Sequence, residues 1–132
     1  LGWIRDNVKD PARVSFCFDT CHVTASGYDM TTKSKATEVL EEFDHFAGLK
    51  QIGVFHFNDS VGSIGSRTDR HAHIGQGNCG LSCFRTILKE ARFDEVPKIL
   101  ETPKEEAKNG EPMDAVNVAK LRRMASAAKK SR

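Results

Sequence analysis

Three short hydrophobic runs alternate with segments of helical periodicity along this chain. The runs occupy residues 14–18, 52–57 and 97–100. They lack the regular polar alternation of a half-exposed strand and are typical of buried parallel strands. Because helical segments separate and follow these runs, the pattern predicts an α/β fold built from right-handed strand–helix units of one parallel sheet.

The helical segments are recognised by hydrophobic residues three and four positions apart. The first is predicted over residues 34–47, capped by Thr32 or Ser34, and its stripe is Ala36, Val39, Leu40, Phe43 and Phe46. A second helix is predicted from the stripe Leu81, Phe84, Ile87, Leu88 and Ala91. Residues 1–8 are read as the end of an earlier helix, and Pro112 opens a last one. The segments 20–32 and 104–110 are expected to be loops.

The composition is that of a globular domain with its own core. Among 132 residues, 39% are hydrophobic and 29% charged, and no apolar run approaches the roughly 20 residues that span a bilayer, so no membrane partner is expected. The cysteines form two C-x3-C pairs, Cys17 with Cys21 and Cys79 with Cys83, rather than the C-x2-C of zinc ribbons. Buried reduced thiols are therefore expected, which favours an intracellular protein.

Charge divides the chain unevenly. Residues 120–132 carry six basic residues and no acidic one, so residues 1–119 have a net charge of −4 within the total of +2. We interpret residues 1–125 as the domain and residues 126–132 as a basic tail. Such a tail can contact nucleic acid or act as a nuclear address, and a solvated helix end explains it equally well.

A metal-ligand residue type ends each of the three predicted strands. Asp19, His56 and Glu101 follow the hydrophobic runs at intervals of about 35 to 45 residues, which suits β/α units. In a (β/α)8 barrel, functional groups gather at the carboxyl ends of the strands and in the loops beyond them. One such residue alone can be a helix cap or a polar rim residue, but all three together indicate a converging site.

Three further candidate ligands lie in the adjoining loops. His22 follows the first strand, and Asp69 and His71 follow the second in a segment that contains Gly62, Gly65, Gly75 and Gly77. Imidazole and carboxylate together suit zinc and related divalent ions and leave a site open to substrate. A histidine-bearing surface loop is commoner than a metal site, yet the strand-end residues favour the metal. Asn58 and Asp59 directly follow His56 and are placed to orient ligands.

Several motifs occur in a characteristic order. They are Asp19-Thr-Cys-His22 with Gly27-Tyr-Asp29, His56-Phe-Asn-Asp59, Gly65-Ser-Arg-Thr-Asp-Arg-His71, Ile74-Gly-Gln-Gly77 and Ile99-Leu-Glu-Thr-Pro103. In order and spacing they resemble the endonuclease IV family of apurinic/apyrimidinic endonucleases. The resemblance covers roughly residues 1–125, and it corresponds to the C-terminal half or somewhat less of such an enzyme.

The resemblance implies a fold, a cofactor and a reaction. The fold is the C-terminal part of a (β/α)8 TIM barrel, with three zinc ions at the mouth of the complete enzyme. Asp19, His56 and Glu101 would be ligands of one zinc, which lacks a bridging glutamate here; His22, Asp69 and His71 would complete another. Glu101 would contribute to catalysis through its metal. The third zinc would have no ligands in this chain.

The substrate implied by the resemblance is double-stranded DNA that contains abasic sites. Zinc ions would activate water and offset the charge of the leaving oxygen, so that the backbone is hydrolysed on the 5′ side of the lesion during base excision repair. Arg70, between two ligands, could meet a DNA phosphate or pair with a ligand carboxylate, and Arg67 and Tyr28 are candidates for the same surface. His73 is extra to the ligand pattern, and His45, on a helix beside Phe46, is read as structural.

Two other interpretations stay open. A sugar isomerase or epimerase on the same barrel also gathers carboxylates and histidines around a divalent ion, although fewer imidazoles would suffice there. Alternatively, the chain is a catalytically inactive zinc-binding fragment. It begins without Met on an apparent helix tail, and three strands leave two sheet edges unpaired. The 132 residues alone are therefore expected to be poorly stable and almost inactive, whereas the complete enzyme is expected to be a monomer in the cytoplasm, nucleoid or nucleus.

Overall fold

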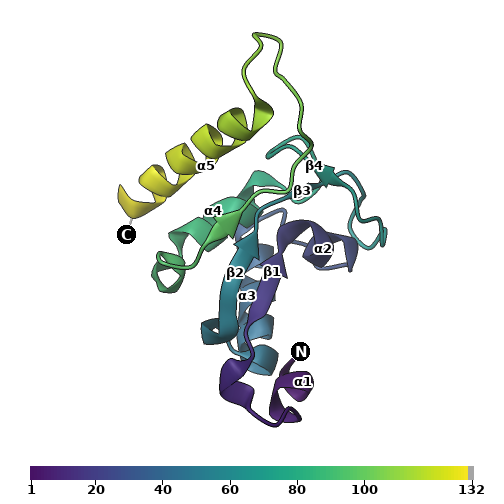
Figure 1. Ribbon diagram of the computed structural model, residues 1–132, viewed down its shortest axis with the longest axis vertical. Coiled ribbons are helices and arrows are strands. Elements are labelled where there is room, and N and C mark those ends of the chain that lie inside the picture. The colour runs from purple at the N-terminus through teal and green to yellow at the C-terminus, as the bar shows by residue number, and fades with distance from the viewer. Residues whose placement is uncertain (131–132) are drawn as a thin grey trace.

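The computed structural model describes residues 1–130 (Figure 1). The α-helices are α1 (Gly2–Asp6), α2 (Thr20–Ala25), α3 (Lys33–Ala47), α4 (Leu81–Lys89) and α5 (Met113–Lys130). The strands are β1 (Phe16–Asp19), β2 (Ile52–His56), β3 (Asp59–Ser60), β4 (His71–Ala72) and β5 (Lys98–Ile99). Short 3₁₀ helices occupy Pro11–Arg13, Leu49–Gln51 and Ala91–Phe93.

The main sheet is parallel and has the order β1-β2-β5. Asp19 lies opposite His56, and His56 lies opposite Ile99. The register shifts once, after Phe16, because Gly53 is an extra residue on β2. Three parallel strands that alternate with helices confirm the predicted α/β fold and its match to part of a (β/α)8 barrel.

One face of this sheet is the core of the molecule. Phe16 and Phe18 of β1, together with Phe55 and Phe57 in and after β2, point to this face and are buried. Helices α3 and α4 cover it (Figure 1), since Phe43 packs edge-on against Phe18 and Phe84 packs against Phe57. Such aromatic pairs add stability beyond their buried area.

The opposite face, here called the inner face, carries Cys17, Val54 and Ile99. Cys17 is exposed and the side chain of Ile99 is 47% exposed. The strands were predicted to be buried on both faces, and this is wrong for the part of the chain that the structure describes, because its helices cover only the other face. The prediction of buried thiols is accordingly wrong for Cys17 and confirmed for Cys21, Cys79 and Cys83, and all four cysteines are free.

The helices differ from the sequence-based expectation at four places. Residues 20–25 form α2 instead of a loop, because the Asp19 carboxylate caps its first turn. Phe46 was expected in the buried stripe of α3 but is 65% exposed, and the neighbouring Ala47 is buried instead. Helix α4 ends at Lys89, so Ala91 lies beyond it. Residues 126–130 of the expected tail continue α5, and residues 131 and 132 lie outside the described residues.

The sequence also predicted how α3 begins. Thr32 is the N-cap of α3, where its hydroxyl accepts a hydrogen bond from the Lys35 N–H, as predicted.

Within residues 1–130, we find no helix whose length and hydrophobicity would let it cross a bilayer.

Replacement of Phe55 by alanine tests the core. Phe55 is fully buried and its ring contacts those of Phe18, Phe57 and Phe93. Phe55→Ala is expected to lower the free energy of unfolding by about 3–5 kcal/mol in urea denaturation. Phe46→Ala is the matched control and should change it by less than about 0.5 kcal/mol. Equal losses would contradict the assigned burial.

Thiol labelling tests the two faces of the sheet. Burial raises the pKa of Cys79 and Cys83 well above the ordinary thiol value, and neither side chain reaches solvent. Cys17 is exposed, although burial of its sulfur and the Asp19 carboxylate raise its pKa as well. Under native conditions, mass spectrometry should find a thiol reagent on Cys17 first, and on the other three only after unfolding. Labelling of all four at one rate would refute this arrangement.

Candidate metal centre

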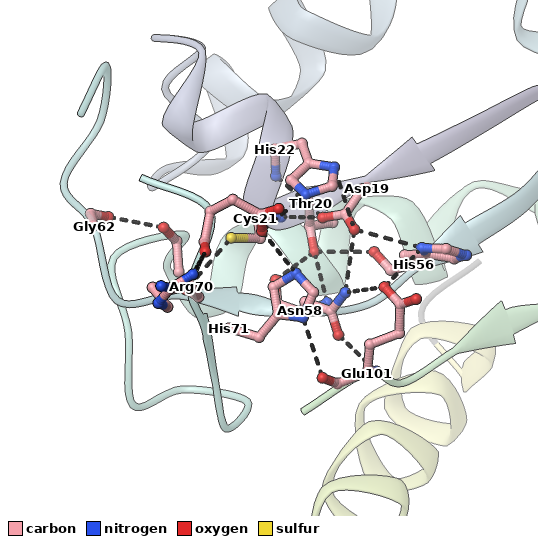
Figure 2. Close-up of polar contacts among 12 residues, drawn as sticks. Asp19, Thr20, Cys21, His22, His56, Asn58, Gly62, Arg70, His71 and Glu101 are labelled. Carbon is pink, nitrogen blue, oxygen red and sulfur yellow. Dashed lines mark hydrogen bonds and ion pairs between the residues drawn. The ribbon is translucent and has the colours of Figure 1, made fainter. Parts of the chain in front are cut away.

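The first group of candidate ligands lies at the carboxyl ends of the three parallel strands. His56 Nδ1 is 2.9 Å from Glu101 Oε2 and 3.5 Å from Asp19 Oδ2. The ligand atoms of all three residues lie within 4.8 Å of one another. Figure 2 shows the three side chains converging from β1, β2 and the segment after β5. The strand-end residues therefore meet as the sequence predicted, and we call them the strand-end group.

The two carboxylate oxygens of Asp19 have different partners. Oδ1 accepts hydrogen bonds from the backbone N–H groups of Cys21, at 2.8 Å, and His22, at 3.1 Å. This caps α2 and fixes the turn from which His22 projects. Oδ2 is left to face His56, and the side chain is only 5% exposed. One carboxylate therefore starts a helix and contributes to the candidate site.

The second group, which we call the loop group, comprises His22, Asp69 and His71. Asp69 Oδ1 lies 3.0 Å from His22 Nε2 and 3.3 Å from His71 Nε2. The hydrogen bond with His22 is the main reason that the pKa of Asp69 is lowered, with smaller Coulombic contributions from His22, His71 and Arg70. The predicted loop residues are thus brought together by one carboxylate oxygen.

His71 is oriented in a way that fits a metal ligand. Its Nδ1 is 3.1 Å from the Glu101 carbonyl oxygen, so this nitrogen carries the proton and donates it. This leaves Nε2 for a metal, since the atom is buried and makes no hydrogen bond within the described part of the chain, and Asp69 Oδ1 lies 3.3 Å away. A backbone carbonyl that fixes the tautomer is typical of metal-bound histidine. The donor set and this unpaired nitrogen fit a divalent ion such as zinc.

Buried Asp59 holds the loop that carries this group. Its Oδ1 accepts from the N–H groups of Ser60 and Cys79, both at 2.9 Å, and its Oδ2 accepts from Gly75 at 2.7 Å. Strands β3 and β4 pair antiparallel, with Ser60 opposite His71. The short hairpin was not predicted, because two-residue strands leave no periodic pattern in a sequence.

The two groups touch. The ligand atoms of Asp19, His22 and His71 all lie within 4.8 Å of one another, as do those of Cys21, Asp69 and His71. Cys21 was not among the predicted ligands, and its thiol instead contacts the Arg70 carbonyl oxygen at 3.6 Å. Burial raises the pKa of this thiol, which opposes the thiolate that a metal would bind.

The candidate DNA-contact residues lie along one loop and the end of α2. The Gly65 N–H donates to the Thr24 carbonyl at 3.0 Å, and the Arg67 N–H donates to that of Ala25 at 2.9 Å, so the loop rests on α2. The Arg70 guanidinium is exposed and donates to the Asp69 carbonyl at 2.9 Å. The Tyr28 side chain is 43% exposed.

The remaining histidines lie apart from both groups. His73 is buried, contacts Glu105 through Nε2 at 3.2 Å and accepts from Asn117 through Nδ1 at 3.1 Å. Its place outside the predicted ligand pattern agrees with this structural network. His45 is exposed on α3, where its ring packs against Phe46.

A partial parallel barrel with candidate nitrogen and oxygen ligands at the carboxyl ends of its strands places the chain in the class of TIM-barrel proteins. The family model for the xylose isomerase-like TIM barrel matches residues 4–124. The chain belongs to this family and, by its relatives, to the endonuclease IV proteins within it.

Those relatives are similar over most of this chain. It is 50% identical over 122 residues, or 92% of its length, to the probable endonuclease 4 of Trichlorobacter lovleyi. It is 45% identical over 103 residues, or 78%, to the apurinic-apyrimidinic endonuclease of Caenorhabditis elegans. The solved structure of endonuclease IV from Thermus thermophilus matches 95% of the chain with a TM-score of 0.76 and 36% identity.

The chain is much shorter than these relatives. It spans 42% of the Trichlorobacter protein, 26% of the Caenorhabditis protein and 42% of the Thermus chain. This agrees with the predicted correspondence to less than half of such an enzyme.

Replacement of Asp59 by asparagine tests how the loop is held. Whichever way the new amide turns, its NH2 group meets a backbone N–H that now donates to a carboxylate oxygen. Loss of a buried charged acceptor should lower the free energy of unfolding by at least about 1–3 kcal/mol. Hydrogen exchange at the Gly75 and Cys79 amides should accelerate in Asp59→Asn and stay unchanged in the exposed control Asp10→Asn. Unchanged exchange in both would show that Asp59 does not hold the loop.

Proposed function

We propose that this chain is part of a zinc-dependent apurinic/apyrimidinic endonuclease. The observation that carries the proposal is the meeting of six predicted ligands at one edge of a parallel sheet, with His71 Nδ1 held by a backbone carbonyl and Nε2 without a hydrogen bond in the described residues. The relatives named endonuclease 4 and apurinic-apyrimidinic endonuclease support the same reaction. The reaction is hydrolysis of the DNA phosphodiester 5′ to an abasic site.

The proposal assigns the ligands to two zinc ions. Asp19, His56 and Glu101 would hold one ion, with Glu101 acting in catalysis through it, and the rest of the enzyme would add a bridging carboxylate. The loop group His22, Asp69 and His71 would hold another. A third ion would be held outside this chain.

When bound, zinc supplies Lewis acidity that lowers the pKa of water and offsets the negative charge of a phosphodiester. This chain supplies the side chains that would hold the ions in position. The carboxylates of Asp19 and Glu101 provide charge that binds cations, and the Glu101 carbonyl contacts His71 Nδ1, so that Nε2 is the ring nitrogen left for an ion. The half-exposed Glu101 side chain, at 44%, leaves its ligand group open to a substrate.

DNA would lie across the rim formed by the α2 end and the loop docked on it. Arg70 and Arg67 are exposed there and can meet phosphates, and Tyr28 offers an exposed ring for stacking. The substrate would be double-stranded DNA with an abasic site. We accordingly place the complete enzyme with DNA inside the cell, as a monomer.

The sugar isomerase alternative differs in its metal. The family description includes xylose isomerase-like barrels, and such an enzyme would use magnesium or manganese on sugar oxygens rather than zinc. Elemental analysis of the complete protein, purified without added metal, distinguishes the two. More than one zinc ion per chain would support the proposed endonuclease. A single magnesium or manganese ion per chain, without zinc, would refute that proposal and favour the isomerase.

Substitution of the ligands tests the reaction. In the complete enzyme, Glu101→Gln and His71→Ala should each lower the rate of incision of abasic duplex DNA by at least about 100-fold, since even outer-sphere changes cost 10- to 100-fold. His45→Ala is the matched control, because this exposed histidine lies on α3 away from both groups. Gel-based incision assays give the rates, and circular dichroism checks folding.

Two results would contradict the proposal. One is full incision activity in both ligand variants. The other is activity that survives prolonged treatment with a zinc chelator. The 132 residues alone are expected to show almost no incision, and robust chelator-sensitive cleavage by them would overturn that expectation.

A further inference from the structure

We infer that Asn58 is a positioning residue for the strand-end group, and that its amide holds the Asp19 and Glu101 carboxylates where a metal needs them. This inference rests on the proposed zinc site. The sequence predicted that Asn58 could orient ligands, and its contacts show which ligands it holds and how (Figure 2).

Asn58 is rigidly placed. It lies two residues after His56, so both side chains point to the inner face of the sheet. The residue is fully buried. Its N–H donates to Thr20 Oγ1 at 3.0 Å, and the Thr20 hydroxyl donates to the Asn58 carbonyl at 2.6 Å. These two hydrogen bonds tie the backbone after β2 to the first residue of α2 and fix the position of Asn58.

The hydrogen bonds fix which way the amide faces. Oδ1 accepts the Glu101 backbone N–H at 2.8 Å, which requires an oxygen at that position. Nδ2 must then face the carboxylates, and it donates to Asp19 Oδ2 at 3.2 Å and to Glu101 Oε2 at 3.1 Å. Both amide hydrogens are used, one for each carboxylate.

The arrangement counters a specific physical problem. The Asp19 and Glu101 carboxylates, on the chain segments either side of β2, repel each other, and repulsion would swing the partly exposed Glu101 side chain toward water. The amide hydrogens bind the same oxygens that lie nearest to His56 Nδ1. Each carboxylate oxygen has a second lone pair, so it can accept from Asn58 and still bind a cation.

The Asn58 side-chain amide also holds the backbone at Glu101. Strand β5 is only two residues long, and Glu101 lies two residues beyond its end. The hydrogen bond from the Glu101 N–H to Asn58 Oδ1 continues the attachment of this segment to β2 past the last ladder bond, from Phe57 to Ile99. Because the Glu101 carbonyl orients His71, Asn58 also connects the strand-end group to the loop group.

Zinc affinity tests this role. Asn58→Leu keeps the number and branching of the side-chain heavy atoms but removes every hydrogen bond of the side chain. In the complete protein carrying Asp69→Ala, which disables the loop group, Asn58→Leu should weaken zinc binding about 10- to 100-fold in competition with a chelating indicator. Cobalt(II) bound in place of zinc should show an altered visible spectrum, since the positions of its ligands change.

The chain offers a matched control in Asn117. This asparagine is 1% exposed, donates through Nδ2 to Thr102 Oγ1 and His73 Nδ1, and accepts the Ile74 N–H at Oδ1. Asn117→Leu should destabilise the metal-free protein to a similar degree. Its zinc affinity should stay within about twofold of the parent, because it contacts no ligand.

A second variant keeps the inference testable if Asn58→Leu folds poorly. Asn58→Asp is isosteric and keeps the acceptor for the Glu101 N–H, but its ionised carboxylate cannot donate. Its added negative charge alone would tighten cation binding, so weaker binding supports positioning and tighter binding refutes it. Equal zinc affinity in Asn58→Leu and the parent, or equal loss in Asn58→Leu and Asn117→Leu, would overturn the inference. A parent protein that binds no zinc would instead refute the proposed function.

Discussion

The parallel register of β1, β2 and β5 is the constraint on which the candidate site depends. Asp19 lies opposite His56, and His56 lies opposite Ile99, so the three chain segments end at one level. Because side chains alternate between faces, residues two positions apart share the inner face. A slip of one residue would send these ligand side chains into the phenylalanine core. The hydrophobic packing of the opposite face therefore fixes the position of the ligands.

Two adjacent residues, Asn58 and Asp59, then hold the two ligand groups. Their side chains point to opposite sides of the chain, so each binds a different part of the site. Asn58 faces the ligands and binds the carboxylates of the strand-end group. Asp59 faces away and binds the backbone of the loop that carries Asp69 and His71. Both are fully buried, and every hydrogen-bonding atom of their side chains has a partner. Loss of either would leave buried polar groups unsatisfied, which is costly.

Sequence patterns predicted the features that repeat or that follow a strand. The phenylalanine-rich runs predicted the parallel strands, and the residues after them gave the strand-end group. The pattern could not show which strand face the helices cover, so Cys17 was wrongly expected to be buried. Phe46 fits helical spacing as well as Ala47 does, and only packing separates them. Helix α2 depends on a cap from Asp19, which the sequence presented as a ligand.

The hydrogen bonds around the site explain how its ligands can be arranged before a metal binds. The Asp19 cap, the Asn58 amide and the Glu101 carbonyl each hold a ligand and leave it a lone pair for the metal. A ligand group ordered in this way loses little conformational freedom on binding, so more of the coordination energy appears as affinity. Within residues 1–130, the inner face below these residues is open at Cys17 and Ile99. The site is therefore organised by hydrogen bonds at the strand ends rather than by packing on the inner face.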